Sequence, residues 1–182
     1  ILGKEMTNSS NDNLCLINID GEGSEIWHSL YGGTNSDEGT YLSEVSGGGF
    51  IIAGSSKSYG NGNWDDMWLV KTSTGGSMEW QKTYGGSYDE TGQYVHEKTE
   101  GGFMIVGSTE SFGQGLFDIW VISTDYTGNE IYSQTFGGNM DDKALKGAKL
   151  ENGALLIIGY TESFGNGGDD VLFITIDPDY HP

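Results

Sequence analysis

One segment recurs along the chain, and this repetition constrains the fold more than any other feature of the sequence. The tripeptide YGG or FGG begins at Tyr31, Tyr84 and Phe136, at spacings of 53 and 52 residues. Other motifs keep the same order and period: IIAGSS, MIVGST and LLIIGYT; SYGNG, SFGQG and SFGNG; DMWLVKTS, DIWVISTD and DVLFITID. Such a period is typical of repeat proteins, in which each unit packs against copies of itself.

Each repeat contains four apolar segments bounded by Gly, Asp, Asn or Ser. In residues 39–91 the segments are TYLSEV, GFIIAGS, DMWLVKTS and SMEWQKTY. Their length and composition predict β-strands, and the middle two are apolar on both faces, as in sheets covered on both sides. A four-stranded unit that packs on both faces against its copies describes a propeller blade. The sequence therefore predicts an all-β fold, a β-propeller of four-stranded antiparallel blades.

The repeats form one propeller segment, residues 1–182, with approximate units 1–38, 39–91, 92–143 and 144–182. The first and last units are partial: we expect the first to lack its inner strand and the last its outer strand. Incomplete ends leave apolar faces and unpaired strand edges, which favour association. We expect a propeller completed by two chains, a fragment of a longer propeller or a filament subunit.

The connections within the repeats have a turn signature of their own. DGEGSE, STGGSM and DYTGNE place Asp or Ser first and Gly fourth. This predicts a type I turn followed by a residue with positive φ, with the first side chain capping the turn amides.

Charge and cysteine content exclude several classes of protein. The 27 acidic and 8 basic residues give a formal charge of −19, which disfavours nucleic acid and anionic membranes as partners. Such a surface attracts cations or keeps the protein in solution. No apolar run approaches the ~20 residues of a membrane helix, so we expect no membrane insertion. Cys15 has no partner for an internal disulfide and aligns with Trp68 and Trp120, so we expect a small buried apolar residue.

These motifs resemble the SBBP β-propeller repeat. The W…YGG…D stretch of residues 80–89 and DIWVISTD of residues 118–125 carry the resemblance, which covers the chain from Gly3 to Asp177. The resemblance implies a propeller in a secreted or cell-surface protein, often within a larger polypeptide. It implies no enzyme activity and no catalytic residues.

Acidic residues recur at two places in the repeat. One follows YGG or FGG, where we align Asp37, Asp89 and Asp141. The other begins the third strand of the unit. The residues of this second group and their neighbours are candidate Ca²⁺ ligands, because Ca²⁺ prefers several hard oxygen ligands; they are Asp65, Asp66, Asp118, Asp169 and Asp170. The alternative is that each Asp caps the loop before its strand.

An aromatic residue recurs in the loop between the second and third strands. If these rings point outward they stack on sugar faces, as in a lectin, and if they point inward they pack between blades. The candidate ligand-binding residues of these loops are Tyr59, Trp64, Phe112, Phe117 and Phe164.

Enzyme and zinc sites have little support. His28, His96 and His181 lie at unrelated repeat positions, and we place His96 in an inner strand lining a central channel. No GxSxG motif occurs, and the absence of Arg argues against a sialidase.

The sequence therefore predicts a non-enzymatic extracellular structural or interaction module, as in a surface layer, fibre or adhesin, with self-association as the expected partner. The second interpretation is a carbohydrate-binding propeller, and the third a carboxylate-based glycan hydrolase or lyase.

Overall fold

The computed structural model of the chain describes residues 1–8 and 11–177. Every regular element in this part is a β-strand, and it contains no helix of the length and hydropathy needed to cross a membrane. The strands follow one another as β1 (Leu2–Asn8), β2 (Asn11–Ile19), β3 (Glu25–Tyr31), β4 (Asp37–Glu44), β5 (Phe50–Ser56), β6 (Asp66–Thr72), β7 (Met78–Tyr84), β8 (Glu90–Glu97), β9 (Phe103–Thr109), β10 (Asp118–Thr124), β11 (Glu130–Phe136), β12 (Asp142–Lys149), β13 (Leu155–Thr161) and β14 (Asp170–Ile176).

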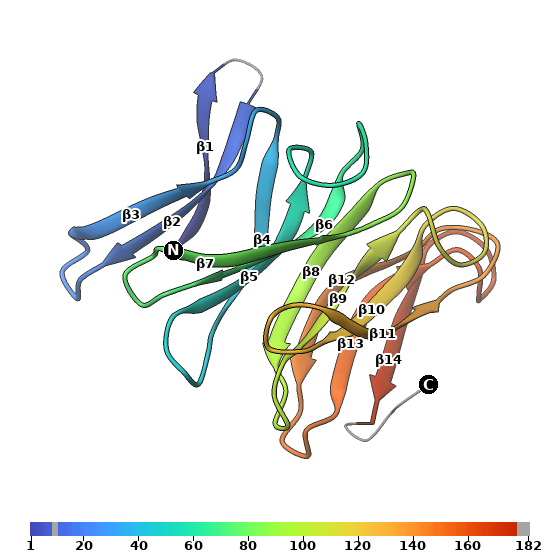
Figure 1. Cartoon of the computed structure of the whole chain (residues 1–182). Coiled ribbons are helices and arrows are strands. Elements are labelled where there is room, and N and C mark those ends of the chain that lie inside the picture. Colours follow the sequence, from blue (N-terminus) through green and yellow to red (C-terminus); the bar gives the residue numbers. More distant parts are fainter. Residues whose placement is uncertain (9–10, 178–182) are drawn as a thin grey trace.

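The strands form four antiparallel sheets in which each strand pairs with its neighbours in sequence (Figure 1). The first sheet is β1-β2-β3, the second β4-β5-β6-β7, the third β8-β9-β10-β11 and the fourth β12-β13-β14. The prediction of an all-β fold with four-stranded antiparallel units is confirmed by the second and third sheets. Among the described residues, the first sheet has no strand equivalent to β4 and β8, and the fourth has none equivalent to β7 and β11.

The sheets pack against one another in sequence order. Strand β4 contacts β1 and β2, β8 contacts β4, β5 and β6, and β12 contacts β8, β9 and β10. The first and fourth sheets lie at opposite ends, so the four described sheets form an open stack rather than a closed ring (Figure 1). We call the side of a sheet turned toward the next sheet in sequence its forward face, and the opposite side its rear face.

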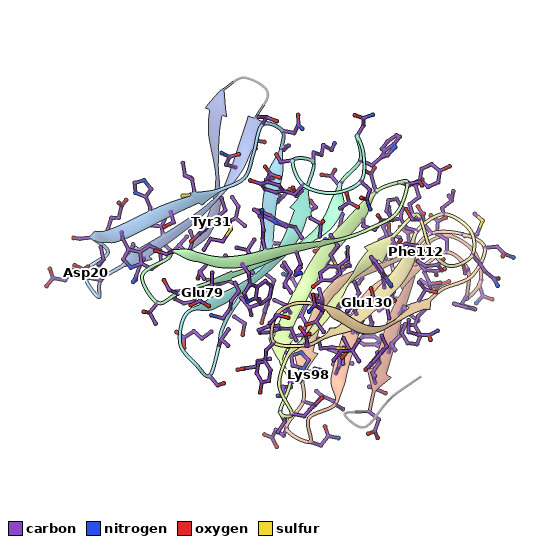
Figure 2. All side chains as sticks on the ribbon, in the orientation of Figure 1. Asp20, Tyr31, Glu79, Lys98, Phe112 and Glu130 are labelled. Atoms are coloured by element: carbon purple, nitrogen blue, oxygen red, sulfur yellow. The ribbon has the colours of Figure 1, made fainter. Side chains whose placement is uncertain are left out.

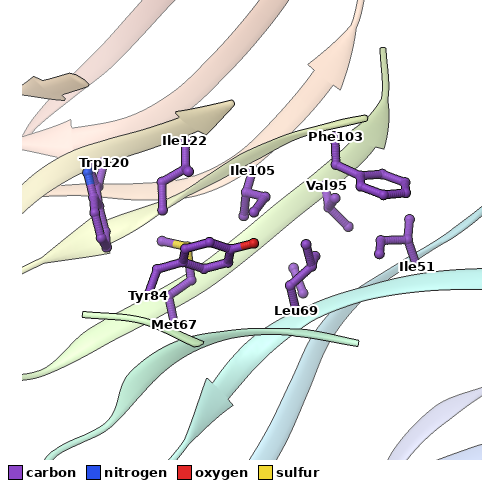
Figure 3. Close-up of a cluster of buried hydrophobic side chains, with 10 residues drawn as sticks. Ile51, Met67, Leu69, Tyr84, Val95, Phe103, Ile105, Trp120 and Ile122 are labelled. Carbon is purple, nitrogen blue, oxygen red and sulfur yellow. The ribbon is translucent and has the colours of Figure 1, made fainter. Parts of the chain in front are cut away.

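Apolar side chains fill each interface between neighbouring sheets. Between the second and third sheets, Met67 and Leu69 of the forward face of β6 meet Trp120 and Ile122 of the rear face of β10 (Figure 3). Every residue of β6, β9 and β10 is buried, because a neighbouring sheet covers both faces of these strands. Cys15 is also buried, as expected from its alignment with tryptophan.

The hairpin turns have the predicted structure. The carboxylate of Asp20 accepts hydrogen bonds from the amides of Glu22 and Ser24, and that of Asp125 accepts from those of Thr127 and Asn129. The fourth residue of each turn is a glycine with φ between 76° and 87°, a conformation that glycine adopts without steric cost: Gly23, Gly76 and Gly128.

A tyrosine hydroxyl connects each of the first two sheets to the next. Tyr31 at the end of β3 donates to the carbonyl oxygen of Gly76, in the turn between β6 and β7. Tyr84 at the end of β7 donates to the carbonyl oxygen of Gly128, 2.6 Å away, in the turn between β10 and β11. These bonds fix the outer strand of one sheet against the outer hairpin of the following sheet.

Candidate functional site

A buried carboxylate begins the inner strand of the second, third and fourth sheets. Asp37, Glu90 and Asp142 are at most 1 % exposed. Each accepts a hydrogen bond from the second glycine amide of the YGG or FGG motif, at 2.8 to 2.9 Å. Each also accepts from a hydroxyl of the second strand, in turn Ser56, Thr109 and Thr161. These carboxylates therefore order the loop that leads into the sheet.

The alignment of Asp37 with Asp89 and Asp141 was wrong by one position. Counted from the glycine pair, the equivalents of Asp37 are Glu90 and Asp142. A glutamate in the third sheet conceals the equivalence, although its longer side chain makes the same bonds. Asp89 and Asp141 instead accept hydrogen bonds from the amides that precede β6 and β10, at 2.8 and 3.1 Å.

The aspartates that begin the third strands cap their own loops. The Oδ2 atoms of Asp66, Asp118 and Asp170 accept hydrogen bonds from loop amides of Asn61, Gln114 and Asn166 at 3.0, 2.6 and 3.2 Å. Burial raises the pKa of Asp66 and of Asp118, and the nearby carboxylates of Glu90 and Asp142 raise them further. These bonds support the capping interpretation of the repeated aspartates.

The candidate calcium ligands do not converge on one point. Asp65 forms an ion pair with Lys57 at 3.2 Å, Asp66 and Asp118 bond their own loops, and Asp169 is exposed beside Asp170. Within residues 1–8 and 11–177, no group of three or more His, Cys, Asp or Glu side chains is placed to hold a metal ion.

The loop aromatics lie over the tryptophan of the third strand. The ring of Tyr59 lies 5.8 Å from that of Trp68, and the ring of Phe112 lies 5.0 Å from that of Trp120. Tyr59 is half-buried, whereas Phe112 is 42 % exposed. Both rings therefore contact the third strand, as the packing interpretation expected, and Phe112 is also exposed to solvent. The interpretation that these rings stack on sugars stays a prediction. Phe164 is exposed on the fourth sheet, whose third strand has Leu172 in place of tryptophan.

The two remaining aromatic candidates lie elsewhere on the loops. Trp64 is exposed, with its ring 6.4 Å from that of Tyr88. Phe117 carries the ammonium group of Lys143 at 3.7 Å from its ring centroid, a cation–π contact. Neither residue lines the cavity described next.

A cavity of about 520 Å³ lies between the second and third sheets, at the edge where β7 faces β11. Phe112 and Trp120 form an aromatic wall, and Glu130 lies near Phe112 in the view of Figure 2. Asn61, Gln134 and hydroxyl side chains of both sheets complete the lining. The sequence indicated Phe112 but not the polar residues of β7 and β11 that line the cavity. These residues belong to outer strands, whose sequence pattern predicts a strand and gives no sign of a binding site.

The two histidines in the described part of the chain do not form a common site. His96 is buried between the third and fourth sheets, so its placement in a channel lining was wrong. Burial, reinforced by the positive charge of Lys149, lowers the pKa of His96 to about 4. His28 is exposed and bonds Glu25 at 2.7 Å, and His181 lies outside the described residues.

No protein family model and no curated protein matches the chain. The resemblance to the SBBP repeat therefore stays a prediction, and the geometry above carries the functional argument.

Proposed function

We propose that the chain is a non-enzymatic structural or interaction module of an extracellular protein, built from β-propeller blades and completed by a second copy of itself. The consecutive antiparallel pairing of the strands and the face-to-face packing of the sheets support the blade architecture. The extracellular location rests on the resemblance to the SBBP repeat. Self-association rests on the two faces at the ends of the stack.

The forward face of the fourth sheet is the observation that carries the proposal. Val171 and Phe173 of β14 are 71 % and 63 % exposed. The residues at the same positions of β2, β6 and β10 are at most 2 % exposed: Leu14 and Leu16, Met67 and Leu69, Ile119 and Val121. This face therefore retains the apolar residues of an inter-sheet interface without a sheet to cover them.

The rear face of the first sheet has the complementary character. Ile26 and Leu30 of β3 are exposed beside the partly buried Ile17 of β2. Each interface between the described sheets joins a forward face to the rear face of the following sheet. A second copy continues this arrangement when its first sheet packs on the fourth sheet. The contact is heterologous, and two chains close it into a ring if each supplies both ends.

The native mass tests this proposal. We expect multi-angle light scattering to give a species of twice the 19.6 kDa chain mass. The double variant Val171→Lys, Phe173→Lys is expected to be monomeric and folded, because both side chains are exposed in the single chain. Ile131→Lys, an equally exposed position in β11, is the matched control and is expected to leave the mass unchanged.

Two outcomes contradict the proposal. If the wild type is a monomer at every concentration, the chain does not associate with itself. If it forms open-ended polymers, it does not form a closed ring of two chains. Repeating the measurement with a calcium chelator separates this contact from a metal-dependent one. We expect no change, because the candidate ligands Asp66 and Asp118 are bonded to their own loops.

The structural role of the acidic residues supports a non-enzymatic module. The most buried carboxylates accept bonds from glycine amides and from hydroxyls of the same sheet. A hydrolase requires two carboxylates free to address a glycosidic bond. We therefore favour the structural module over the hydrolase or lyase.

A further inference from the structure

The two interfaces between the first three sheets differ in the hydrogen bonds made by the loop aromatic and by the tryptophan that it contacts. Between the first and second sheets, Tyr59 packs on Trp68 and its hydroxyl donates to the carbonyl oxygen of Gly32 at 2.7 Å. The indole Nε1 of Trp68 donates to Oε1 of Gln81 at 3.0 Å. Both polar groups of this aromatic pair are therefore bonded to the protein.

Two substitutions remove these bonds between the second and third sheets. Phe112 stands where the preceding repeat has Tyr59, so no hydroxyl reaches toward the carbonyl of Gly85, the equivalent of Gly32. Ser133 stands where the preceding repeat has Gln81: Gln81 pairs with Val70, and Ser133 pairs with Ile122 at the same position of β10.

The serine side chain leaves the indole of Trp120 without its expected acceptor. The only interaction of the Trp120 side chain with the described part of the chain, apart from apolar packing, is its ring contact with Phe112. Its N–H therefore donates to no described residue. The cavity of about 520 Å³ lies where these two bonds are missing, and both Trp120 and Ser133 line it.

The chemistry of the lining selects the kind of ligand. Phe112 offers an exposed aromatic ring, and the surrounding polar groups are hydroxyls, amides and one carboxylate: Thr83, Ser133, Thr135, Asn61, Gln134 and Glu130. A few polar groups around an aromatic wall, in a volume of several hundred Å³, are typical of small-molecule sites. A sugar ring matches this lining, because it has an apolar C–H face and a rim of hydroxyls that both donate and accept.

Charge restricts the class further. The lining contains one acidic side chain, Glu130, and no basic side chain. The chain as a whole has a formal charge of −19. Uronic acids, sialic acids and sulfated sugars are therefore disfavoured by repulsion.

We propose that the cavity between the second and third sheets binds one neutral hexose unit of a glycan, stacked on Phe112 and hydrogen-bonded to the indole N–H of Trp120. The carboxylate of Glu130 and the carbonyl oxygen of Gly85 accept from sugar hydroxyls. This site is separate from the end faces used in the proposed self-association, and we place it at one interface between described sheets rather than in every repeat.

Nuclear magnetic resonance of the full chain tests the site directly. The indole N–H signals of ¹⁵N-labelled protein are followed while methyl glycosides of glucose, galactose, mannose and N-acetylglucosamine are added one at a time. Trp120→Phe assigns the relevant signal among those of the 5 tryptophans. We expect at least one glycoside to shift the Trp120 signal with a millimolar dissociation constant. The Trp68 signal is the internal control, because its N–H is already bonded to Gln81.

A double variant, called the closing variant, tests whether binding depends on the cavity and not only on a folded chain. Phe112→Tyr with Ser133→Gln gives this interface the two residues that bond the equivalent atoms between the first and second sheets. We expect the double variant to remain folded and to bind the glycoside at least tenfold more weakly. The matched control, Tyr59→Phe with Gln81→Ser, changes the other interface and is expected to leave binding at Trp120 unchanged.

Three results overturn the proposal. In the first, none of the glycosides shifts the Trp120 signal at saturating concentration. In the second, the closing variant binds as tightly as the wild type. In the third, tetramethylammonium shifts the signal and the glycosides do not, which identifies a cation site formed by Phe112 and Glu130. None of these results depends on the native mass, so the test of glycan binding is independent of the test of self-association.

Discussion

In the motifs that follow β7 and β11, the first glycine lies against the aspartate that begins the third strand of its sheet. A Cβ atom added to Gly85 would lie 1.8 Å from Oδ1 of Asp66 and 2.5 Å from Oε2 of Glu90. Gly137 has the same relation to Asp118 and Asp142. The glycine is therefore required by close approach, and not by a positive φ at these two positions.

We expect Gly85→Ala to destabilise the protein by about 2–3 kcal/mol, because the extra carbon forces two buried carboxylates to move in a packed interface. Urea denaturation measures the loss. Gly62→Ala is the control, since a Cβ there meets nothing within 4 Å. Equal stability of the two variants would show that the carboxylates have room to shift.

The buried side chain of His96 makes the free energy of unfolding depend on pH. Its pKa is about 4 in the folded protein, mainly because burial disfavours the charged ring, and 6.5 in the unfolded chain. Between these values the unfolded chain binds a proton that the folded chain does not. The contribution of His96 to the free energy of unfolding is therefore complete above about pH 6.5. It declines as the pH falls toward 4, by roughly 2–4 kcal/mol in all.

The variant His96→Gln isolates this contribution. The difference in unfolding free energy between wild type and variant is expected to change between pH 6.5 and 4 and to be constant above that range. Other groups, such as the exposed Asp125 with its pKa lowered to about 2 by loop hydrogen bonds, cancel in the difference. A constant difference across the whole range would mean that the ring is solvated.

At the scale of elements, the outer strands connect one sheet to the next through tyrosine. We expect Tyr84→Phe to cost about 1 kcal/mol, because it leaves the carbonyl oxygen of Gly128 without this donor. Thermal or urea unfolding measures the change, and Tyr88→Phe, an exposed tyrosine, serves as the control. The third outer strand already ends in Phe136, and within the described residues the fourth sheet has no outer hairpin that a hydroxyl could reach. No loss in Tyr84→Phe would assign the tyrosine to packing alone.

Most elements could be predicted from the sequence because their signals are local. Strands such as β6 and β10 combine an initial aspartate with a run of apolar residues, and the turns at Asp20 and Asp125 combine an Asx side chain with a later glycine. The buried carboxylate of the third sheet escaped because Glu90 replaces aspartate while Asp89 stands beside it. Counting from the glycine pair distinguishes the two, and the hydrogen bonds of Glu90 agree with that count.

The cavity could not be predicted, because it depends on residues far apart in sequence that act together. Phe112 belongs to a loop and Ser133 to the following outer strand, and each substitution is unremarkable alone. The pairing of Ser133 with Ile122 and the ring contact of Phe112 with Trp120 bring these residues to one cavity. The prediction that His96 lines a channel was wrong for a similar reason. The alternation of side chains along a strand does not show which neighbouring sheet covers each face.

At the scale of the whole molecule, the high negative charge opposes the compact state. With 27 acidic and 8 basic residues and a formal charge of −19, repulsion between carboxylates is weakly compensated. We expect the melting temperature to rise with sodium chloride, as ions screen this repulsion. Differential scanning fluorimetry measures the rise. Calcium chloride at matched ionic strength is the comparison, and a much larger rise with calcium would point to a metal site in the acidic loops.

The sequence-ordered packing of the sheets has a consequence for how the molecule opens. The hydrogen bonds that join one sheet to the next connect neighbouring repeats, as between Thr40 and Gly92 or between Lys149 and Glu97, each separated by 52 positions. Chains organised in this way unfold by peeling units from an end, because removing an end unit breaks only one interface. In native-state hydrogen exchange, the amides of β13 and β14 should therefore exchange with deuterium before those of β6 and β9, and a second copy bound to the end face should slow them selectively.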